Sequence, residues 1–348
     1  MLKQTYLVKN FRKQCVMIFI ETISSNLLSI PLMFFILGIV AGVIRSDLSI
    51  PESIGNYLTI YLMLSIGFKG GVTIAEADSV DNNMWILISL SLILGFIQPY
   101  IGHILLQITT KIDIPTSAAI AAHYGSISVV TFITASAFLK SNQIEYAGYI
   151  VAIMALMEAP AILSGLHIAH RYAPSSFTNT NTTTNSASSH PMHKIFTNGA
   201  IVLLLGSFVI GWQGGAGGME KMEGFIVAPF QGMLSLFLLD MGLTVAKELG
   251  YLRKFTIPLF LFGIYMPLIG AAIGLSISML LNLDLGTGML FMTLCASASY
   301  IAVPAVMRHA LPQAKAALYI PISLAITFPF NIIIGIPLYY AVASRFLG

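Results

Sequence analysis

The sequence predicts an all-α polytopic membrane protein with ten transmembrane helices. Composition is the first observation behind this prediction, because 57% of the 348 residues are hydrophobic and only 9% are charged. A soluble domain typically has about 25% charged residues. The second observation is a regular succession of long apolar segments, and the third is that two of these segments are interrupted by small and polar residues. Basic residues are scattered among the loops, so nothing indicates nucleic-acid binding.

Residues 1–28 are predicted to form an N-terminal interfacial segment. Four basic residues precede a short apolar run at 15–20. This run is shorter than the about 20 residues that a spanning helix needs, and no signal-peptide cleavage site follows it. We expect its basic side chains to lie among lipid head groups.

Ten apolar segments follow, and each is long enough to cross about 30 Å of hydrocarbon, although the sixth is marginal. The predicted spans are residues 29–45, 54–75, 84–107, 114–139, 145–169, 196–212, 224–246, 256–281, 286–308 and 315–343.

A linker divides the spans into two halves of five, residues 29–169 and 196–348. The linker, residues 170–195, contains a Ser-, Thr- and Asn-rich stretch at 173–190 that has almost nothing to bury and is predicted to be disordered. The halves align with Gly67 opposite Gly242 and with Glu158-Ala-Pro opposite Thr327-Phe-Pro. Because five is odd, two such units would cross the membrane in opposite directions, which predicts an inverted-topology repeat.

The distribution of basic residues in short loops predicts the orientation. Nine Lys and Arg residues fall on the linker side and three on the other side, if the N-terminal tail is left out. The linker is therefore predicted to be cytoplasmic and both termini outside, in a bacterial inner membrane, although the basic tail argues for the opposite orientation.

Two polar runs, residues 121–131 and 295–304, interrupt the fourth and ninth spans. Backbone groups in hydrocarbon must all be satisfied, so such breaks are tolerated only inside the protein or beside a cavity. Broken helices at corresponding places in two halves are typical of a transporter site, and helix N-termini there would suit a small oxyanion. The predicted substrate-binding residues are Gly125, Ser126, Ser128, Thr131, Ser297, Ser299 and Pro304. The alternative is that the small residues only allow close helix packing.

Ionisable residues inside spans are costly and usually functional. Glu158 and Asp240, with the hydroxyls of Ser128 and Thr327, are predicted to take part in cation coupling. Glu158 has the alternative of a buried carboxylate bonded to backbone groups freed by Pro160.

Three further residues are candidates for gating or pH sensing. They are His123, Lys69 and Tyr300. A histidine changes charge between about pH 5 and 8, and the alternative for His123 is a neutral packing group.

Several motifs occur in the order seen in one transporter family. They are Leu64-Ser-Ile-Gly-Phe-Lys-Gly-Gly71, Gly125-Ser-Ile-Ser128, Ile144-Glu-Tyr146, Met157-Glu-Ala-Pro-Ala161, Pro229-Phe-Gln-Gly-Met-Leu-Ser235, Met241-Gly242, Leu252-Arg-Lys254 and Ala296-Ser-Ala-Ser299 with Pro304. From about Ile30 to the C-terminus, apart from the linker, the chain resembles the sodium-dependent bicarbonate transporters best known from cyanobacteria. The resemblance implies a ten-span fold of two inverted five-helix units, a homotrimer, and symport of bicarbonate with Na⁺. In some members it also implies inhibition by a cytoplasmic PII-like protein.

The sequence departs from the family pattern inside both polar runs. Val129, Val130 and Val303 stand where the family has small or hydroxyl residues, and Tyr300 stands where it has an acidic residue. These changes remove oxygen ligands of the kind that Na⁺ uses. Asp240 and Lys69 are also unusual for the family, so the resemblance predicts the fold better than the substrate.

The predicted function is sodium-coupled bicarbonate symport by alternating access, with Na⁺ as coupling ion and no other cofactor. The alternative within transport is a proton- or sodium-coupled carrier of another small (organic) anion. Alternatives of other classes are an intramembrane enzyme, a sensor or a channel. No His-Glu-x-x-His or Gly-x-Ser-x-Gly motif occurs, which argues against an enzyme.

Overall fold

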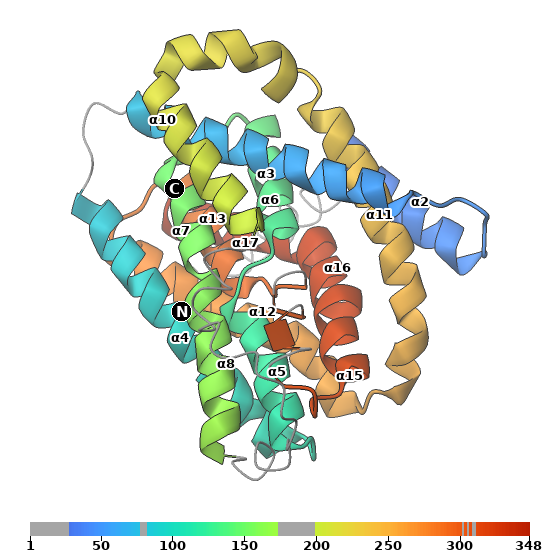
Figure 1. Ribbon diagram of the computed structural model, residues 1–348. Helices are drawn as coiled ribbons and strands as arrows, with labels where there is room; N and C mark the ends of the chain where they lie inside the picture. The colour runs from blue at the N-terminus through green and yellow to red at the C-terminus, as the bar shows by residue number, and fades with distance from the viewer. Residues whose placement is uncertain (1–27, 77–81, 173–198, 301–302, 305, 308–310) are drawn as a thin grey trace, which may run out of the picture.

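The computed structural model describes residues 28–76, 82–172, 199–300, 303–304, 306–307 and 311–348, and all of its regular elements are helices. The predicted interfacial segment (except residue 28) and the linker from residue 173 onward lie outside the described residues. The helices form two bundles that meet along one side (Figure 1).

The first bundle contains α2 (Ile30–Val43), α3 (Glu52–Ala75), α10 (Gly199–Ile226) and α11 (Phe230–Glu248). Figure 1 shows α3 beside α10 and α2 beside α11. Glycines allow both contacts: Gly38 and Gly242 face each other between α2 and α11, and Gly71 lies against the Phe208 carbonyl of α10. Any Cβ at these positions would overlap the facing backbone, so small residues fix these helix pairs in close contact.

The second bundle contains the remaining helices. They are α4 (Asn82–Thr109), α5 (Ile114–Gly125), α6 (Val129–Ser141), α7 (Tyr149–Leu156), α8 (Glu158–Tyr172), α12 (Ile257–Leu280), α13 (Leu285–Ala296) and the C-terminal series α15 (Ala316–Pro321), η3 (Ile322–Thr327), α16 (Phe328–Phe330), η4 (Asn331–Gly335) and α17 (Ile336–Phe346). The short 3₁₀ helix η2 (Leu249–Lys254) leads from α11 to this bundle. Buried aliphatic and aromatic side chains of the second bundle form two cores, and one of these cores also includes side chains of α2, α3 and α11.

Six helical segments in the described part of the chain are long and apolar enough to cross a membrane. They coincide with the predicted spans at 54–75, 84–107, 114–139, 145–169, 256–281 and 315–343. A bent pair, Leu205–Ile226 with Phe230–Arg253, passes the same test together and raises the count to seven. The remaining predicted spans correspond to α2 and α13, which have 14 and 12 residues. The protein is thus a multi-pass membrane protein, and the count of ten stays a prediction.

The residues between the predicted spans 196–212 and 224–246 are largely helical, with a turn at Gly215. Helix α10 continues through these residues to Ile226 and bends at Gly215, whose φ of 53° and ψ of −151° are not helical. Glycine adopts a positive φ without the steric cost that a Cβ would bring, so the chain turns there within the helix.

Helices α4 and α12 carry the same glycine and proline spacing. Gly95, Pro99 and Gly102 in α4 correspond to Gly263, Pro267 and Gly270 in α12. Each helix presses on the end of a short helix: Pro99 contacts Gly125 at the end of α5, and Gly270 contacts the Cys295 carbonyl at the end of α13.

The starts of α5 and α13 are also alike. Asp113 caps α5 by accepting from the Thr116 N–H at 2.9 Å, and Asp284 caps α13 by accepting from the Thr287 N–H at 2.9 Å. The Thr116 hydroxyl oxygen accepts from the Lys315 N–H, and that of Thr287 from the Ala147 N–H, at 3.0 and 2.8 Å. Each half therefore anchors the loop before the last helical segment of the other half.

The cap of α5 carries an ion pair as well, between the Asp113 carboxylate and the Lys315 ammonium at 2.9 Å. Burial tends to raise the pKa of Asp113, but hydrogen bonds from Thr116 and the charge of Lys315 outweigh this and lower the pKa. The Asp113 carboxylate therefore stabilises the folded state at pH values above the pKa that Asp113 has in the unfolded chain. This stabilisation is lost as the pH falls through the lower pKa that Asp113 has in the folded protein.

We predict that Gly270→Ala destabilises the protein by about 1–3 kcal/mol, because the added methyl overlaps the Cys295 carbonyl and pushes α12 from α13. Thermal unfolding of the purified protein measures this. Gly224→Ala is the matched control, since a Cβ there meets no atom within 4 Å, and it should be neutral or stabilising by up to about 1 kcal/mol. Equal unfolding temperatures for the two variants would contradict the packing described.

Candidate functional site

The structure brings the two polar runs together. Helix α5 ends at Gly125 and α6 begins at Val129, and the chain between them is extended, with a ψ of 158° at Ser126. Helix α13 likewise ends at Ala296, and the chain is extended at Ser297, with a ψ of 164°. We call the meeting of these two breaks the crossing.

Hydrogen bonds join the two breaks directly. The Ser299 N–H donates to the His123 carbonyl at 2.8 Å, and the Ser128 N–H donates to the Ser297 hydroxyl at 3.0 Å. The His123 ring contacts the Ser299 carbonyl through Nδ1. Because a carbonyl only accepts, Nδ1 carries the proton, and a neutral His123 has its lone pair on Nε2.

Two buried amides satisfy the carbonyls at the end of α13. Gln98 of α4 donates to the Cys295 carbonyl at 2.5 Å, and Asn331 of η4 donates to the Ala296 carbonyl at 2.9 Å. The Tyr339 hydroxyl donates to the Asn331 side-chain oxygen at 2.7 Å. The sequence analysis missed Gln98 and Asn331, although an amide within an apolar span was a usable signal.

Ser128 caps α6 with its own side chain. Its hydroxyl oxygen accepts from the Thr131 N–H at 3.2 Å and from the Thr131 hydroxyl at 2.9 Å. Both residues are buried. These bonds are therefore structural. The one hydroxyl proton that they leave, that of Ser128, lies beside the Tyr300 hydroxyl, with which Ser128 interacts weakly. Pro304 is buried beyond the second break.

Four buried side-chain atoms in the described part of the chain have no hydrogen-bond partner, and three belong to the crossing. They are His123 Nε2, Ser126 Oγ and Tyr300 Oη, and the fourth is Ser65 Oγ. His123 and Ser126 are 0% and 1% exposed, and the Tyr300 ring packs on Phe328 with centroids 5.1 Å apart. Each unpaired polar group costs about 1–3 kcal/mol, and three of these four atoms belong to the two polar runs.

Thr327 and Glu158 lie around the crossing in different settings. The Thr327 hydroxyl donates to the Gly263 carbonyl at 2.7 Å, so Tyr124 donates to Thr327 across 2.7 Å. Glu158 starts α8 and is 6% exposed. Among the described residues, no hydrogen bond or ion pair reaches its carboxylate.

Lys69 and Asp240 lie in the first bundle and do not pair with each other. The Lys69 ammonium lies 4.0 Å from the centroid of the Phe230 ring, a cation–π contact. Asp240 faces Gly55 of α3. Neither is brought into contact with the residues of the crossing.

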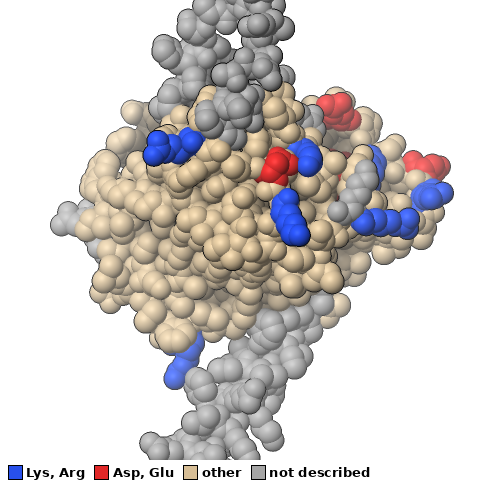
Figure 2. Space-filling model, turned by 90° about the horizontal axis from the view of Figure 1, so that it is seen from below, with Lys and Arg blue, Asp and Glu red and all other residues tan. Residues whose placement is uncertain are grey.

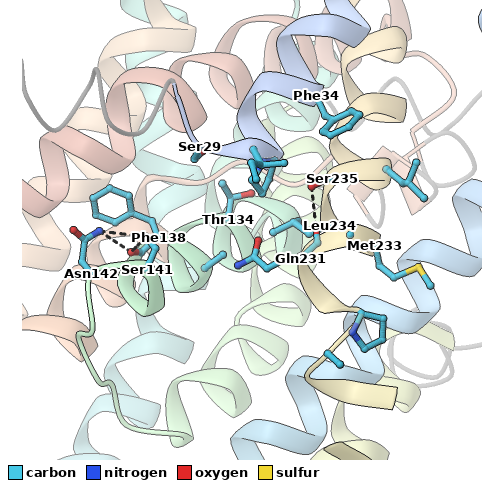
Figure 3. A pocket seen from close by; sticks show the side chains of 17 residues that line it. Ser29, Phe34, Thr134, Phe138, Ser141, Asn142, Gln231, Met233, Leu234 and Ser235 are labelled. Carbon is cyan, nitrogen blue, oxygen red and sulfur yellow. Dashed lines mark hydrogen bonds between the residues drawn. The ribbon is translucent and has the colours of Figure 1, made fainter. Parts of the chain in front are cut away.

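A cavity of about 980 Å³ lies elsewhere, between α2, α6 and α11 (Figure 3). Its polar lining residues are Ser29, Thr134, Ser141, Asn142, Gln231 and Ser235, and most of the others are apolar. No residue predicted for the site lines it, although Thr134 is one turn beyond Thr131 on α6. Within the described residues, no group of three or more His, Cys, Asp or Glu residues could hold a metal ion.

Comparison with protein families gives one match. The model of the Na⁺-dependent bicarbonate transporter superfamily matches residues 31–344 of the 348. The chain belongs to this superfamily. No curated protein sequence matches the chain. The family match covers both breaks and both bundles, so the crossing and the cavity are features of a membrane transporter.

We predict that Asn331→Leu lowers stability by about 0.6–1.7 kcal/mol, the range for interhelical hydrogen bonds in membranes, because it leaves the Ala296 carbonyl and the Tyr339 hydroxyl unpaired. Tyr339→Phe breaks only the second bond and should cost less. Thermal unfolding of both variants measures the difference. An Asn331→Leu variant as stable as wild type would show that this amide does not hold the break.

Proposed function

We propose that the protein is a secondary active transporter that carries bicarbonate together with Na⁺, and that the anion binds at the crossing. The observation that carries the proposal is the group of unpaired buried atoms there, His123 Nε2, Ser126 Oγ and Tyr300 Oη. The superfamily match supports the class of cargo.

The chemistry of these atoms suits an anion that also carries a hydroxyl. Neutral His123 Nε2 accepts a hydrogen bond, whereas the hydroxyls of Ser126 and Tyr300 donate. Bicarbonate has one O–H group for the histidine and two further oxygens for the hydroxyls. Chloride and nitrate have no proton to donate and would leave Nε2 unpaired.

An inverted repeat of two five-helix units in ten spans is part of the proposal. The shared caps of α5 and α13, the shared glycine and proline spacing of α4 and α12, and the reciprocal anchoring through Thr116 and Thr287 support it. In such carriers one bundle moves against the other around a fixed site. We propose that the crossing stays intact while the second bundle moves against the first.

Sodium coupling rests on the superfamily and on the oxygen ligands still present. The hydroxyls of Thr131 and Thr327 and the carboxylate of Glu158 are oxygens of the kind that a hard cation binds. The Ser128 oxygen, also predicted for cation coupling, already accepts two hydrogen bonds from Thr131, and Val129 and Val130 contribute no oxygen. The competing candidate is proton coupling, favoured by the unpaired and fully buried Nε2 of His123.

The orientation is supported by the charges. The face seen in Figure 2 carries Lys and Arg side chains together with some Asp and Glu side chains. Lys111, Arg171 and Lys315, which belong to loops predicted on the linker side, are exposed. We propose that this face is cytoplasmic, in a bacterial inner membrane, with the linker on the same side and both termini outside. A homotrimer and a PII-like regulator stay predictions from the resemblance.

The test is uptake of radiolabelled bicarbonate into proteoliposomes under an inward sodium gradient, a proton gradient or neither. Protein-free liposomes correct for diffusion of CO₂. We expect bicarbonate to accumulate under the sodium gradient. Accumulation under the proton gradient alone would show that transport is coupled to protons instead of Na⁺. Flux that neither saturates nor accumulates would indicate a channel, and no flux from folded, inserted protein would contradict the proposal.

We predict that Ser126→Ala raises the KM for bicarbonate about tenfold, because it removes one hydrogen bond to a charged ligand. Without bicarbonate the variant should be at least as stable as wild type, since the change removes a buried hydroxyl that has no partner within the protein. Ser278→Ala is the matched control: that buried hydroxyl donates only to Gly274 of its own helix at 2.8 Å, so KM should not change. Unchanged KM in Ser126→Ala would remove Ser126 from the site.

A further inference from the structure

The cavity between α2, α6 and α11 is formed by both bundles. Pro31 and Phe34 come from α2, Met233 and Leu236 from α11, and Ala137 from α6. Figure 3 shows the walls from α6 and α11 on opposite sides of the space, with Phe34 of α2 above it. A molecule bound here would contact both parts of the protein at once.

The cavity is too large and too apolar to serve bicarbonate alone. Its volume of about 980 Å³ is at the upper end of the about 300–1,000 Å³ of pockets that hold drug-sized ligands. The polar groups at its edges are few. The Thr134 and Ser235 hydroxyls donate to their own helices at 2.8 and 2.7 Å, and the Asn142 amide donates to the Phe138 carbonyl at 2.8 Å. The walls therefore favour a hydrocarbon or aromatic body.

Two lysines, Lys69 and Lys140, lie near residues that line the cavity. One carboxylate, Asp240, lies one turn beyond the lining residue Leu236 on α11 and faces Gly55 of α3. Lys69 lies over the ring of Phe230. The two sequence neighbours of Phe230, Pro229 and Gln231, line the cavity. Lys140 lies on α6 beside the lining residue Ser141, and it is the charge that acts on Lys69. No carboxylate lines the cavity, and neither lysine forms an ion pair with a described residue.

We propose that this cavity is a second ligand site that binds an amphipathic organic monoanion, such as a medium-chain carboxylate. Its apolar body would lie between α2, α6 and α11, with the carboxylate toward Lys69 and Lys140. Because the ligand contacts both bundles, it holds their relative position and inhibits transport. The binding itself is independent of the proposed function, and only the inhibition rests on it.

The probe is decanoate below its micellar concentration, measured first by its effect on the thermal unfolding temperature of the purified full-length protein. Acetate lacks the chain, and decyltrimethylammonium has the chain with the opposite charge. We expect decanoate to raise the unfolding temperature and the other two to have no such effect. The second readout is inhibition of labelled bicarbonate uptake by decanoate.

Substitutions at two glycines test the cavity, because one glycine lines it and the other does not. Gly232 lines it, Gly224 does not, and a Cβ at either meets no atom within 4 Å. Gly232→Trp should abolish the decanoate effect and Gly224→Trp should retain it. Ala137→Phe fills the space from the α6 wall and should act like Gly232→Trp. Lys140→Gln should weaken the decanoate effect several-fold, whereas Lys221→Gln, an exposed lysine on α10, should not.

The outcomes separate this site from the proposed function. Decanoate stabilisation that survives both filling variants, or that decyltrimethylammonium reproduces, would overturn the site. The same holds if wild-type protein shows no stabilisation. If wild type is stabilised but no bicarbonate uptake exists under any gradient, the second site holds and the proposed function fails. If uptake exists and bound decanoate does not inhibit it, the inference that the ligand holds the two bundles in one relative position is wrong.

Discussion

Every backbone group at membrane depth needs a hydrogen-bond partner, and the rest of this structure depends on how the two breaks meet that need. Ending α5 at Gly125 and α13 at Ala296 frees carbonyls and N–H groups where no water is available. The breaks satisfy one another through His123, Ser128, Ser297 and Ser299. Gln98 and Asn331 then supply donors for the carbonyls that remain. The crossing is thus a fixed joint, which neither half could build alone.

Fixing the crossing determines what can move and what can bind. Close contact at Gly125 and Gly270 presses α4 and α12 onto the same joint, so the second bundle is tied together through its centre. The first bundle is held by separate glycine contacts between α2 and α11 and between α3 and α10. The space between the bundles includes the cavity at α6 and α11. In our proposal a small anion binds within the joint, and a larger amphipathic anion binds between the bundles.

Much of the architecture could be predicted from the sequence, because hydropathy and chain breaks are local properties. Six predicted spans coincide with apolar helices, and the polar runs at Ser126 and Ser297 mark the ends of α5 and α13. The course of α10 through Gly215 could not be predicted, since a glycine cluster is compatible with both a loop and a bent helix. The roles of Asn331 and Thr116 depend on partners about 35 and 199 residues away in sequence. The cavity was also missed, because its lining comes from three helices with no shared motif.

The most direct test of the central claim is competition by formate, which has the planar carboxylate of bicarbonate and lacks its hydroxyl. If His123 Nε2 accepts the bicarbonate proton, formate leaves that buried nitrogen unpaired. Its inhibition constant against labelled bicarbonate uptake should then exceed the KM for bicarbonate by about tenfold or more. Formate that competes as well as unlabelled bicarbonate would show that the unpaired atoms of the crossing do not recognise the hydroxyl, and the account of this site would be wrong.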